Sequence, residues 1–531
     1  MAPNGSDNAA GSEAAPFGSV QRAQDAASPG DTVFLRGGTY VFTGNAEIGV
    51  LFDKDGAPGQ PISYVAYPGE TPVFDFFQLL PQARIRGFSV RASWLVFRGF
   101  ELRGVQQTLV DVNESWGIRV ENGASNDVFE QLDIHHNEGP GLFINDGGDN
   151  LVLNVDSHHN WDGDRGGENA DGFGCHSNDA GNVFRGCRAF RNSDDGFDFI
   201  NAPGGCTVEG SWAFYNGYVP DTFTAEGNGN GIKAGGFGLD AATFPNPVPR
   251  HLVRFNVAFG NLAAGFYANH HPGGGDWFNN TAFDNPRNFD MLADVGAADH
   301  LLRNNLALAP GMPIARFNAG EIDDDVNSWT LPVEVSQADF VSLAEEQALL
   351  PRQADGSLPN VDFLQLAPES DLIDRGEDRG FPFNDAAPDL GAFETGGPLP
   401  LPGQEAPPGN AGEVPPGSAP EVPVAPGLGV AVPGMDVTGS PGGVPNAGPP
   451  DVGVGAPDLA GGGEPSPSLD PSLNPMGMGG ARESGGCACR LQEPRGSSAP
   501  LAWLGLLALS ALLRRAAHRS APHRSSTRRA A

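Results

Sequence analysis

The sequence of 531 residues predicts an all-β fold, a right-handed parallel β-helix with an N-terminal capping helix. A unit of about 24 residues recurs through the middle of the chain, and periods of this size are typical of solenoids. The apolar residues of each unit form short β-type runs without helical periodicity. We therefore expect each unit to be one coil of about three short strands.

The start of the solenoid is predicted within the first 40 residues. The stretch from Val20 to Ala27 is amphipathic and predicts a helix. Pro29-Gly30-Asp31 predicts a turn, and Thr32 to Leu35 predicts the first strand. A helix here would protect the open end of a stack of strands.

A recurring asparagine sets the register of the units. It is found at Asn137, Asn160, Asn192, Asn216, Asn261 and Asn285. The shorter separations define the unit, and the longer ones indicate units with insertions. We expect these asparagines to stack as a hydrogen-bonded ladder in a tight turn, which is a structural role and not a catalytic one.

Stacking of the coils predicts which side chains become neighbours, because adjacent coils lie about 4.8 Å apart. Each unit has a glycine followed by an apolar residue, which we expect to point inward. These apolar residues are Leu142, Phe173, Phe197, Ile232 and Phe266. The next residue points outward because strand side chains alternate. On this alignment Asp198 and Lys233 are outward neighbours, and Asp171 lies one coil from Asp195.

Two insertions flank this acidic coil, between Asn160 and Gly172 and between Asn216 and Gly231. We expect them to form walls of a groove, since long loops on a rigid scaffold often build functional sites. The alternative is neutral variation in loop length.

Four carboxylates, those of Asp171, Asp194, Asp195 and Asp198, are predicted to gather on this face. Hard oxygen ligands in this number suit calcium, which takes six to eight oxygens in loose geometry. The alternative is an acidic turn without a metal. The stacking of Asp171 and the position of Lys233 favour a calcium site.

Lysine is rare in this sequence, which contains Lys54 and Lys233 against 29 arginines. Lysine can lose its proton and act as a base, whereas arginine effectively cannot. A nearby divalent cation lowers the pKa of an ammonium group, so we expect activity to favour alkaline pH. A base beside a cation site suits proton abstraction next to a carboxylate, as in β-elimination on a uronic acid polymer.

The formal net charge of -34 argues against nucleic acid as a partner. It also opposes an acidic substrate unless a cation bridges the two. A solvated acidic surface of an extracellular protein is the simpler explanation for most of this charge.

Four segments carry a family resemblance: Asn169 to Phe173, Gly181 to Cys187, Asn192 to Asp198, and Gly227 to Lys233. They resemble polysaccharide lyase family nine, the calcium-dependent pectate lyases, over roughly residues 3–395. The resemblance implies that the four aspartates bind calcium and that Lys233 takes the C5 proton of polygalacturonate or pectin. Two alternatives remain: a non-catalytic β-helix adhesin or glycan-binding protein, and a uronan epimerase.

Three regions follow from composition. Residues 1–395 are the predicted β-helix domain. Residues 396–484 are rich in Pro and Gly and predict a disordered linker. Residues 485–531 contain Cys487 and Cys489, an apolar run and a basic end, and resemble a myxobacterial C-terminal sorting signal; a simple membrane tail is the alternative. We expect a monomer that is secreted or held at the cell surface, although no N-terminal leader is visible.

Other side chains are ambiguous. We expect Cys175, Cys187 and Cys206 to be small buried thiols. The pairs His158–His159 and His270–His271 are candidate bases or ligands, but exposed turn positions are the preferred interpretation. The tryptophans that either stack on sugars or pack in the protein are Trp161, Trp212 and Trp277.

Overall fold

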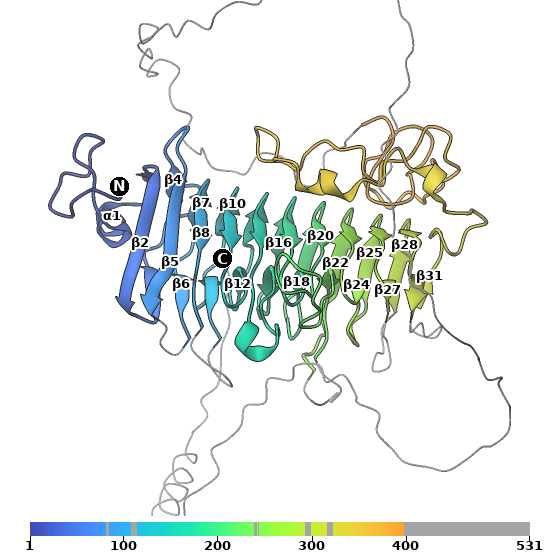
Figure 1. Ribbon diagram of the computed structural model, residues 1–531, viewed down its shortest axis with the longest axis horizontal. Helices are drawn as coiled ribbons and strands as arrows, with labels where there is room; N and C mark the ends of the chain where they lie inside the picture. Colours follow the sequence, from blue (N-terminus) through green and yellow to red (C-terminus); the bar gives the residue numbers. More distant parts are fainter. Residues whose placement is uncertain are drawn as a thin grey trace, which may run out of the picture. The chain divides into compact units, whose positions relative to one another are not determined.

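The computed structural model describes residues 1–397 except 81–83, 108–113, 238–241, 243, 292–298 and 316–321. Apart from residues 396 and 397, the predicted linker and tail lie outside the described residues. The described chain winds into stacked coils that form three parallel sheets (Figure 1). The predicted β-helix is therefore confirmed.

Each complete coil contributes one strand to each sheet, and β31 extends the first sheet alone among the described strands. The first sheet consists of β1 (Thr32–Leu35), β4 (Ile62–Ala66), β7 (Leu95–Arg98), β10 (Val128–Glu130), β13 (Leu151–Leu153), β16 (Asn182–Arg185), β19 (Cys206–Glu209), β22 (His251–Arg254), β25 (Gly275–Phe278), β28 (His300–Arg303) and β31 (Ile322–Asp324). The second sheet consists of β2 (Gly38–Asn45), β5 (Pro72–Leu80), β8 (Glu101–Arg103), β11 (Asp133–His135), β14 (Asp156–His158), β17 (Arg188–Phe190), β20 (Trp212–Phe214), β23 (Val257–Phe259), β26 (Thr281–Phe283) and β29 (Leu306–Leu308). The third sheet consists of β3 (Ile48–Phe52), β6 (Arg86–Val90), β9 (Trp116–Val120), β12 (Leu142–Ile144), β15 (Phe173–Cys175), β18 (Phe197–Asp198), β21 (Ile232–Lys233), β24 (Ala264–Tyr267), β27 (Arg287–Asp290) and β30 (Met312–Ala315).

The predicted N-terminal helix is α1 (Val20–Ala26), and β1 has the predicted bounds. The Ser19 side chain accepts a hydrogen bond from the backbone N–H of Arg22 at 3.1 Å, which caps the first turn. Val20 and Ala23 are buried in the same core that fills the coils. The helix thus seals the core at the first coil. Three short 3₁₀ turns are also described: Gly163–Arg165, Gln337–Asp339 and Glu345–Leu349.

The predicted asparagine ladder is present and buried. From Asn137 to Asn285, each side-chain amide donates to the Oδ1 of the asparagine one coil later, at 2.9–3.1 Å. A second ladder, not predicted, runs through Asn256, Asn280, Asn305 and Asn327. Each ladder satisfies turn groups that are buried between coils.

The outer face of the second sheet carries a stacked aromatic column, Phe190, Phe214, Phe259 and Phe283, in successive coils. Phe190 and Phe214 stack at 4.9 Å, and Phe214 and Phe259 at 4.8 Å. Residues of the C-terminal segment, including Phe340 and Phe363, pack onto this column and bury it. This segment is yellow to orange in Figure 1. Leu390, near the end of this segment, belongs to the same buried cluster.

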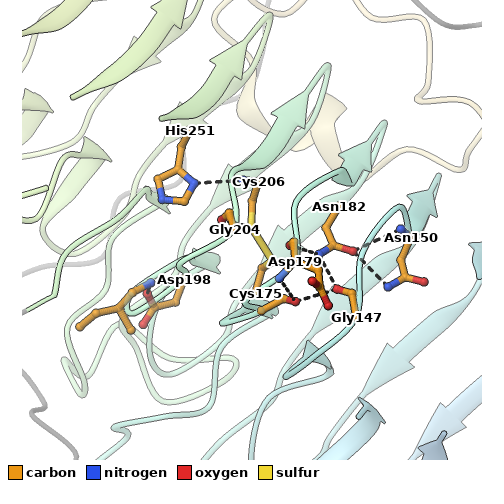
Figure 2. The surroundings of a disulfide bond; sticks show 11 residues. Gly147, Asn150, Cys175, Asp179, Asn182, Asp198, Gly204, Cys206 and His251 are labelled. Carbon is orange, nitrogen blue, oxygen red and sulfur yellow. Dashed lines mark hydrogen bonds between the residues drawn. A yellow bond between two sulfur atoms is a disulfide. The ribbon is translucent and has the colours of Figure 1, made fainter. Parts of the chain in front are cut away.

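The cysteine prediction was wrong for two of the three core residues. Cys175 of β15 and Cys206 of β19 form a disulfide across the interior (Figure 2), and Cys187 is a free buried thiol. The bond joins the third sheet to the first. The spacing along the sequence, 31 residues, gave no sign that winding would bring these two thiols together.

Three histidines are buried beside the turns that lead into the first sheet: His251, His271 and His300. His271 is 1% exposed, so the expectation of an exposed turn position was wrong for this residue. Burial lowers the pKa of His271 to about 4 and that of His300 to about 3. Burial, with neighbouring His271, also lowers the pKa of His251.

None of the helices in the described part of the chain combines the length and the apolar character that a membrane span requires.

Replacing Asn216 by Ala removes the Oδ1 that accepts hydrogen bonds from the backbone N–H and the side-chain amide of Asn192. We expect the free energy of unfolding to fall by about 2–4 kcal/mol, since each orphaned buried group costs about 1–3 kcal/mol. Urea denaturation measures the loss. The exposed Asn360→Ala is the control and should change stability by less than about 0.5 kcal/mol. A loss for Asn216→Ala no larger than the control contradicts the role of the ladder.

Acidification should destabilise the fold through the buried histidines. Their pKa values are depressed in the folded state, so their stabilising contribution is complete above about pH 6.5, the unfolded value. It is lost as the pH falls towards 4 for His271 and towards 3 for His300. Each contributes a slope of about 1.4 kcal/mol per pH unit in that window. The unfolding free energy of His300→Gln should therefore depend less steeply on pH between 6 and 4 than that of the parent, and equal slopes would count against this explanation.

Candidate active site

The predicted site residues lie at the third sheet, on three successive coils. Asp171 lies two residues before β15, Asp194 and Asp195 precede β18, Asp198 ends β18, and Lys233 ends β21. β15, β18 and β21 pair in parallel, and Asp198 is the register partner of Lys233. Residues 35 positions apart in sequence thus become neighbours.

Side-chain alternation separates the core from the site, as predicted. Phe173, Phe197, Ile232 and Phe266 point inward and are fully buried in the core. Phe173 and Phe197 stack at 4.9 Å. Packing on the inner face fixes the height and direction of the coils, so the outward side chains are held at a defined spacing.

The Lys233 amine lies between two carboxylates. Its Nζ atom is 3.0 Å from Oδ2 of Asp198 and 3.1 Å from Oδ2 of Asp195. Lys233 is 6% exposed, yet it is not part of the hydrophobic core, whereas the preceding Ile232 is. The lysine is therefore enclosed on the outer face among polar groups.

Three of the predicted calcium ligands form one tight group. Carboxylate oxygens of Asp171, Asp195 and Asp198 all lie within 4.8 Å of one another. The backbone N–H of Asp195 donates to Oδ1 of Asp171 at 3.1 Å, which links the two coils. Asn230 holds Oδ1 of Asp195 through its backbone N–H at 2.7 Å and its side-chain amide at 2.8 Å.

Asp194 is outside this tight group and joins the two inserted loops. Its Oδ2 accepts the N–H of Asn169 at 2.7 Å, and its Oδ1 accepts the N–H of Asn228 at 2.8 Å. The loops also contact each other, since Gly227 N–H donates to Gly166 O at 3.0 Å. The two insertions that flank the acidic coil are thus fastened to it and to one another.

The charges of the site are strongly coupled. Burial, reinforced by the neighbouring aspartates, raises the pKa of Asp171 well above its ordinary value. Burial and the proximity of Asp195 raise the pKa of Asp194 to about 8. Burial alone would lower the pKa of Lys233, but Asp195 and Asp198 outweigh it and hold that pKa well above its ordinary value. Without further positive charge, Lys233 keeps its proton and is a poor base.

The donor set fits a hard divalent cation. All the grouped donors are carboxylate oxygens, which calcium prefers. Oδ2 of Asp195 is buried and makes no hydrogen bond of good geometry, although it lies at ion-pair distance from Lys233. A buried, incompletely satisfied carboxylate oxygen facing two other carboxylates is suited to bind a cation.

The candidate sugar-stacking tryptophans separate into two kinds. Trp212 and Trp277 are buried, so their role is packing. Trp161 is 42% exposed and lies in the first inserted loop, where its Nε1–H donates to Glu226 of the second loop at 2.6 Å.

One residue that the sequence analysis missed is His176, which packs on Phe143 with the ring centroids 4.6 Å apart and whose Nε2 is buried without a hydrogen-bond partner. Its place on the outer face, two residues after Gly174, follows from the same alternation.

The chain matches the family model described as the Pel9A-like, right-handed β-helix region over residues 1–305. It is 36% identical to pectate lyase L of Dickeya chrysanthemi, an alignment that covers 74% of this chain and 89% of that protein. It is 32% identical to pectate lyase PEL9 of Emericella nidulans, covering 67% of this chain and 89% of that protein.

The solved structures similar to this one include two lyases. The crystal structure of pectate lyase Pel9A has a TM-score of 0.64 and 36% identity, covering 74% of this chain and 95% of that chain. A structure named rhamnogalacturonan lyase has a TM-score of 0.65 and 34% identity, covering 69% of this chain and 96% of that chain. The two likenesses are of similar strength although the named substrates differ.

Replacing Asp194 by Ala removes the acceptor that fastens both inserted loops. We expect amide hydrogen exchange at Asn169 and Asn228 to accelerate about tenfold or more, because the N–H of each loses its hydrogen bond to a buried carboxyl oxygen. The exposed Asp25→Ala is the matched control and should leave these amides unchanged. Unaltered exchange at both amides in Asp194→Ala, measured in chelator, contradicts the fastening role.

Proposed function

The chain belongs to the Pel9A-like right-handed β-helix family and is a polysaccharide lyase, and we propose that it cleaves polygalacturonate by calcium-assisted β-elimination. The observation that carries this proposal is the Lys233 amine, 3.0 Å from Asp198 and 3.1 Å from Asp195 on the outer face of the solenoid. A binding protein has no need of an amine in such a cage.

The proposed calcium ligands are Asp171, Asp194, Asp195 and Asp198. The close group of three supports this assignment for Asp171, Asp195 and Asp198. Asp194 is the weaker member, because both of its oxygens already accept backbone N–H groups. Each carboxylate oxygen retains a second lone pair, so the hydrogen bonds leave room for a cation.

Bound calcium would neutralise the uronate carboxylate and so acidify the proton on the adjacent carbon. Lys233, in its neutral form, takes that C5 proton. The C5–H electron pair forms the C4=C5 double bond, the C4–O bond breaks, and the departing oxygen takes up a proton from solvent. The carboxylates that hold the pKa of Lys233 high are the same groups that a cation would neutralise, so cation binding favours the free amine.

We expect the substrate to lie outside the cell, because a polymer of uronic acids is too large to enter. The Cys175–Cys206 disulfide supports a secreted or cell-surface protein, since disulfides persist in oxidising compartments. We expect the acidic surface to exclude nucleic acid and the chain to act as a monomer.

Rhamnogalacturonan is the second candidate substrate, because the likeness to a rhamnogalacturonan lyase is as strong as that to Pel9A. Its backbone also contains uronate, so the same base and cation would serve. A substrate panel of polygalacturonate, methyl-esterified pectin and rhamnogalacturonan separates these candidates.

Incubation with polygalacturonate and calcium should release unsaturated product that absorbs in the ultraviolet. Lys233→Ala should lower the initial rate by about 100-fold or more, the contribution of a general base. The chain supplies a matched control in its other lysine: Lys54 bonds to the backbone carbonyls of Gln24 and Asp25, and Lys54→Ala should retain the parental rate. A chelator should abolish product formation, and added calcium should restore it.

The outcomes distinguish the alternatives. Polysaccharide binding without product in the parent chain would indicate the adhesin. A change in uronate stereochemistry without chain cleavage would indicate an epimerase. Full activity of Lys233→Ala rules out the proposed base, whichever substrate is cleaved.

A further inference from the structure

A group of arginines lies on the outer face of the third sheet, over β6 and β9, although the whole chain has a formal net charge of -34. Its members are Arg84, Arg86, Arg91 and Arg119. Three of them share the carboxylate of Glu121, with their Nε atoms 3.0–3.3 Å from its oxygens. The fourth, Arg84, lies 3.4 Å from Glu114. This face therefore gathers positive charge in a strongly acidic protein.

Three of these arginines cover an aromatic pair outside the hydrophobic core. Trp116 and Phe143 are buried, yet neither belongs to the core that fills the coils. The guanidinium carbon of Arg119 lies 3.9 Å from the centroid of the Trp116 ring and 5.5 Å from that of Phe143. Those of Arg84 and Arg86 each lie 5.6 Å from the Trp116 centroid. Such cation–π contacts position guanidinium groups without neutralising their charge.

The charge of this group is only partly balanced. Burial, with Arg86 and Arg84 nearby, lowers the pKa of Arg119 to about 10, and Glu121 only partly opposes this effect. The guanidinium group still carries its proton at neutral pH. A lowered pKa means that the surroundings favour its charge less than water does, so an added anion would stabilise it.

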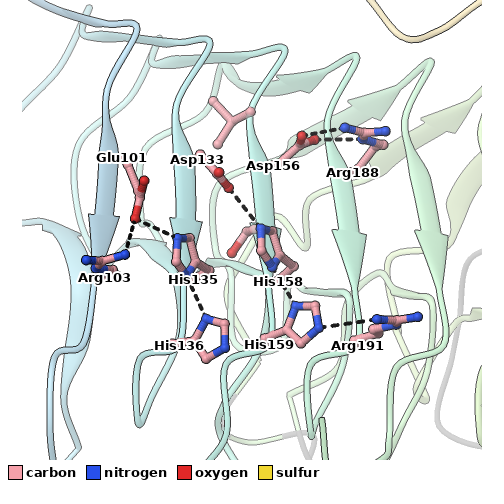
Figure 3. Close-up of polar contacts among 12 residues, drawn as sticks. Glu101, Arg103, Asp133, His135, His136, Asp156, His158, His159, Arg188 and Arg191 are labelled. Carbon is pink, nitrogen blue, oxygen red and sulfur yellow. Dashed lines mark hydrogen bonds and ion pairs between the residues drawn. The ribbon is translucent and has the colours of Figure 1, made fainter. Parts of the chain in front are cut away.

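The outer face of the second sheet matches its cationic and titratable side chains differently (Figure 3). Arg103 lies between two carboxylates, 2.9 Å from Glu101 and 3.1 Å from Asp75. The half-buried His158 has Asp133 at 2.9 Å. The side chains with a carboxylate within 3.2 Å on this face include Arg103, His158, His159 and Arg188. One carboxylate shared by three arginines is therefore not a general property of the solenoid surface.

The arginine group and the acidic site lie along one outward column of the third sheet. Arg119, Phe143, Gly174 and Asp198 are successive register partners in β9, β12, β15 and β18. Arg119 thus lies three coils, or about 14 Å, from Asp198. The Phe143 ring leans over Gly174, where an added Cβ atom would lie 2.4 Å from it. The column between the two charged regions is therefore apolar.

We propose that Arg84, Arg86 and Arg119 form a subsite for a uronate carboxylate of the same polymer that is cleaved at Lys233, an inference that rests on the proposed function. Polygalacturonate carries one carboxylate per sugar. A chain that runs along the solenoid from the acidic site therefore presents further carboxylates over β9. The planar guanidinium group suits a carboxylate, because it can donate two parallel hydrogen bonds to it.

The subsite is open to solvent and complements the acidic site. The side chain of Arg84 is 51% exposed, and those of Arg86 and Arg119 retain 16% and 12%. The aspartates beside Lys233 need a cation before an anionic sugar can approach, whereas the arginines accept one directly. The subsite selects long and unesterified chains, since a short chain does not span both regions and a methyl ester removes the charge.

Binding of an octagalacturonate to the full chain carrying Lys233→Ala, in calcium, tests the subsite while the ligand stays intact. Isothermal titration calorimetry measures the affinity. Arg84→Gln should weaken binding about threefold or more, and Arg119→Gln about tenfold or more, because each removes donors to a carboxylate. Arg119→Lys keeps the charge and should weaken binding less than Arg119→Gln. Arg103→Gln, on the second sheet, is the matched control and should bind as the unaltered background does.

Calcium titration without sugar separates the subsite from the acidic site. Arg84→Gln and Arg119→Gln should bind calcium as the background does, and circular dichroism checks that both keep the fold. A loss of calcium affinity equal to the loss of sugar affinity would place the effect at the acidic site and overturn the subsite.

Failure of the subsite and failure of the proposed function give different results. Unchanged octagalacturonate binding in both Arg84→Gln and Arg119→Gln, with full cleavage of polygalacturonate by the parent chain, overturns the subsite alone. Weakened binding in both variants, with no unsaturated product from the parent chain, supports the subsite and contradicts β-elimination.

Discussion

The register of parallel coils is the constraint on which the rest of the structure depends. Phe173, Phe197 and Ile232 stack in the interior, and the asparagine ladder fastens the turns between coils. Together they bring residues that are far apart in sequence into lateral contact. A slip of one residue would turn the outward side chains of a strand inward, so the ladder and the core together determine that Asp198 and Lys233 meet on the outer face.

The outer face of the third sheet holds several ionisable side chains that are buried close together. Four aspartates and one lysine lie largely buried within three coils, and burial disfavours their charged forms. Hydrogen bonds from the two inserted loops offset part of that cost, because Asp194 accepts the backbone N–H groups of Asn169 and Asn228. A divalent cation would offset more and would release Lys233 from its pairing. The cluster of buried carboxylates around Lys233 thus explains both why a cation would bind here and how the lysine would become a base.

The sequence predicted the features that repeat and missed those that depend on non-repeating contacts. The β-helix, the capping helix, the first ladder and the Asp198–Lys233 pair all followed from a period and from alternation. The Cys175–Cys206 bond and the burial of His271 did not, because they depend on how one side of a coil faces another across the interior. The C-terminal cover on the aromatic column has no periodicity and could not be inferred. The stacking of His135 on His158 could not be inferred from the sequence, because it depends on the register of β11 and β14.

The central claim is that the carboxylates beside Lys233 hold a calcium ion against a uronate. A crystal structure of Lys233→Ala soaked with calcium and an oligogalacturonate tests it most directly. The account predicts anomalous density at about 2.3–2.6 Å from oxygens of Asp171, Asp195 and Asp198, with a sugar C5–H directed at the place the amine occupied. A calcium ion and oligosaccharide bound elsewhere on the solenoid, with these aspartates free of metal, would contradict it.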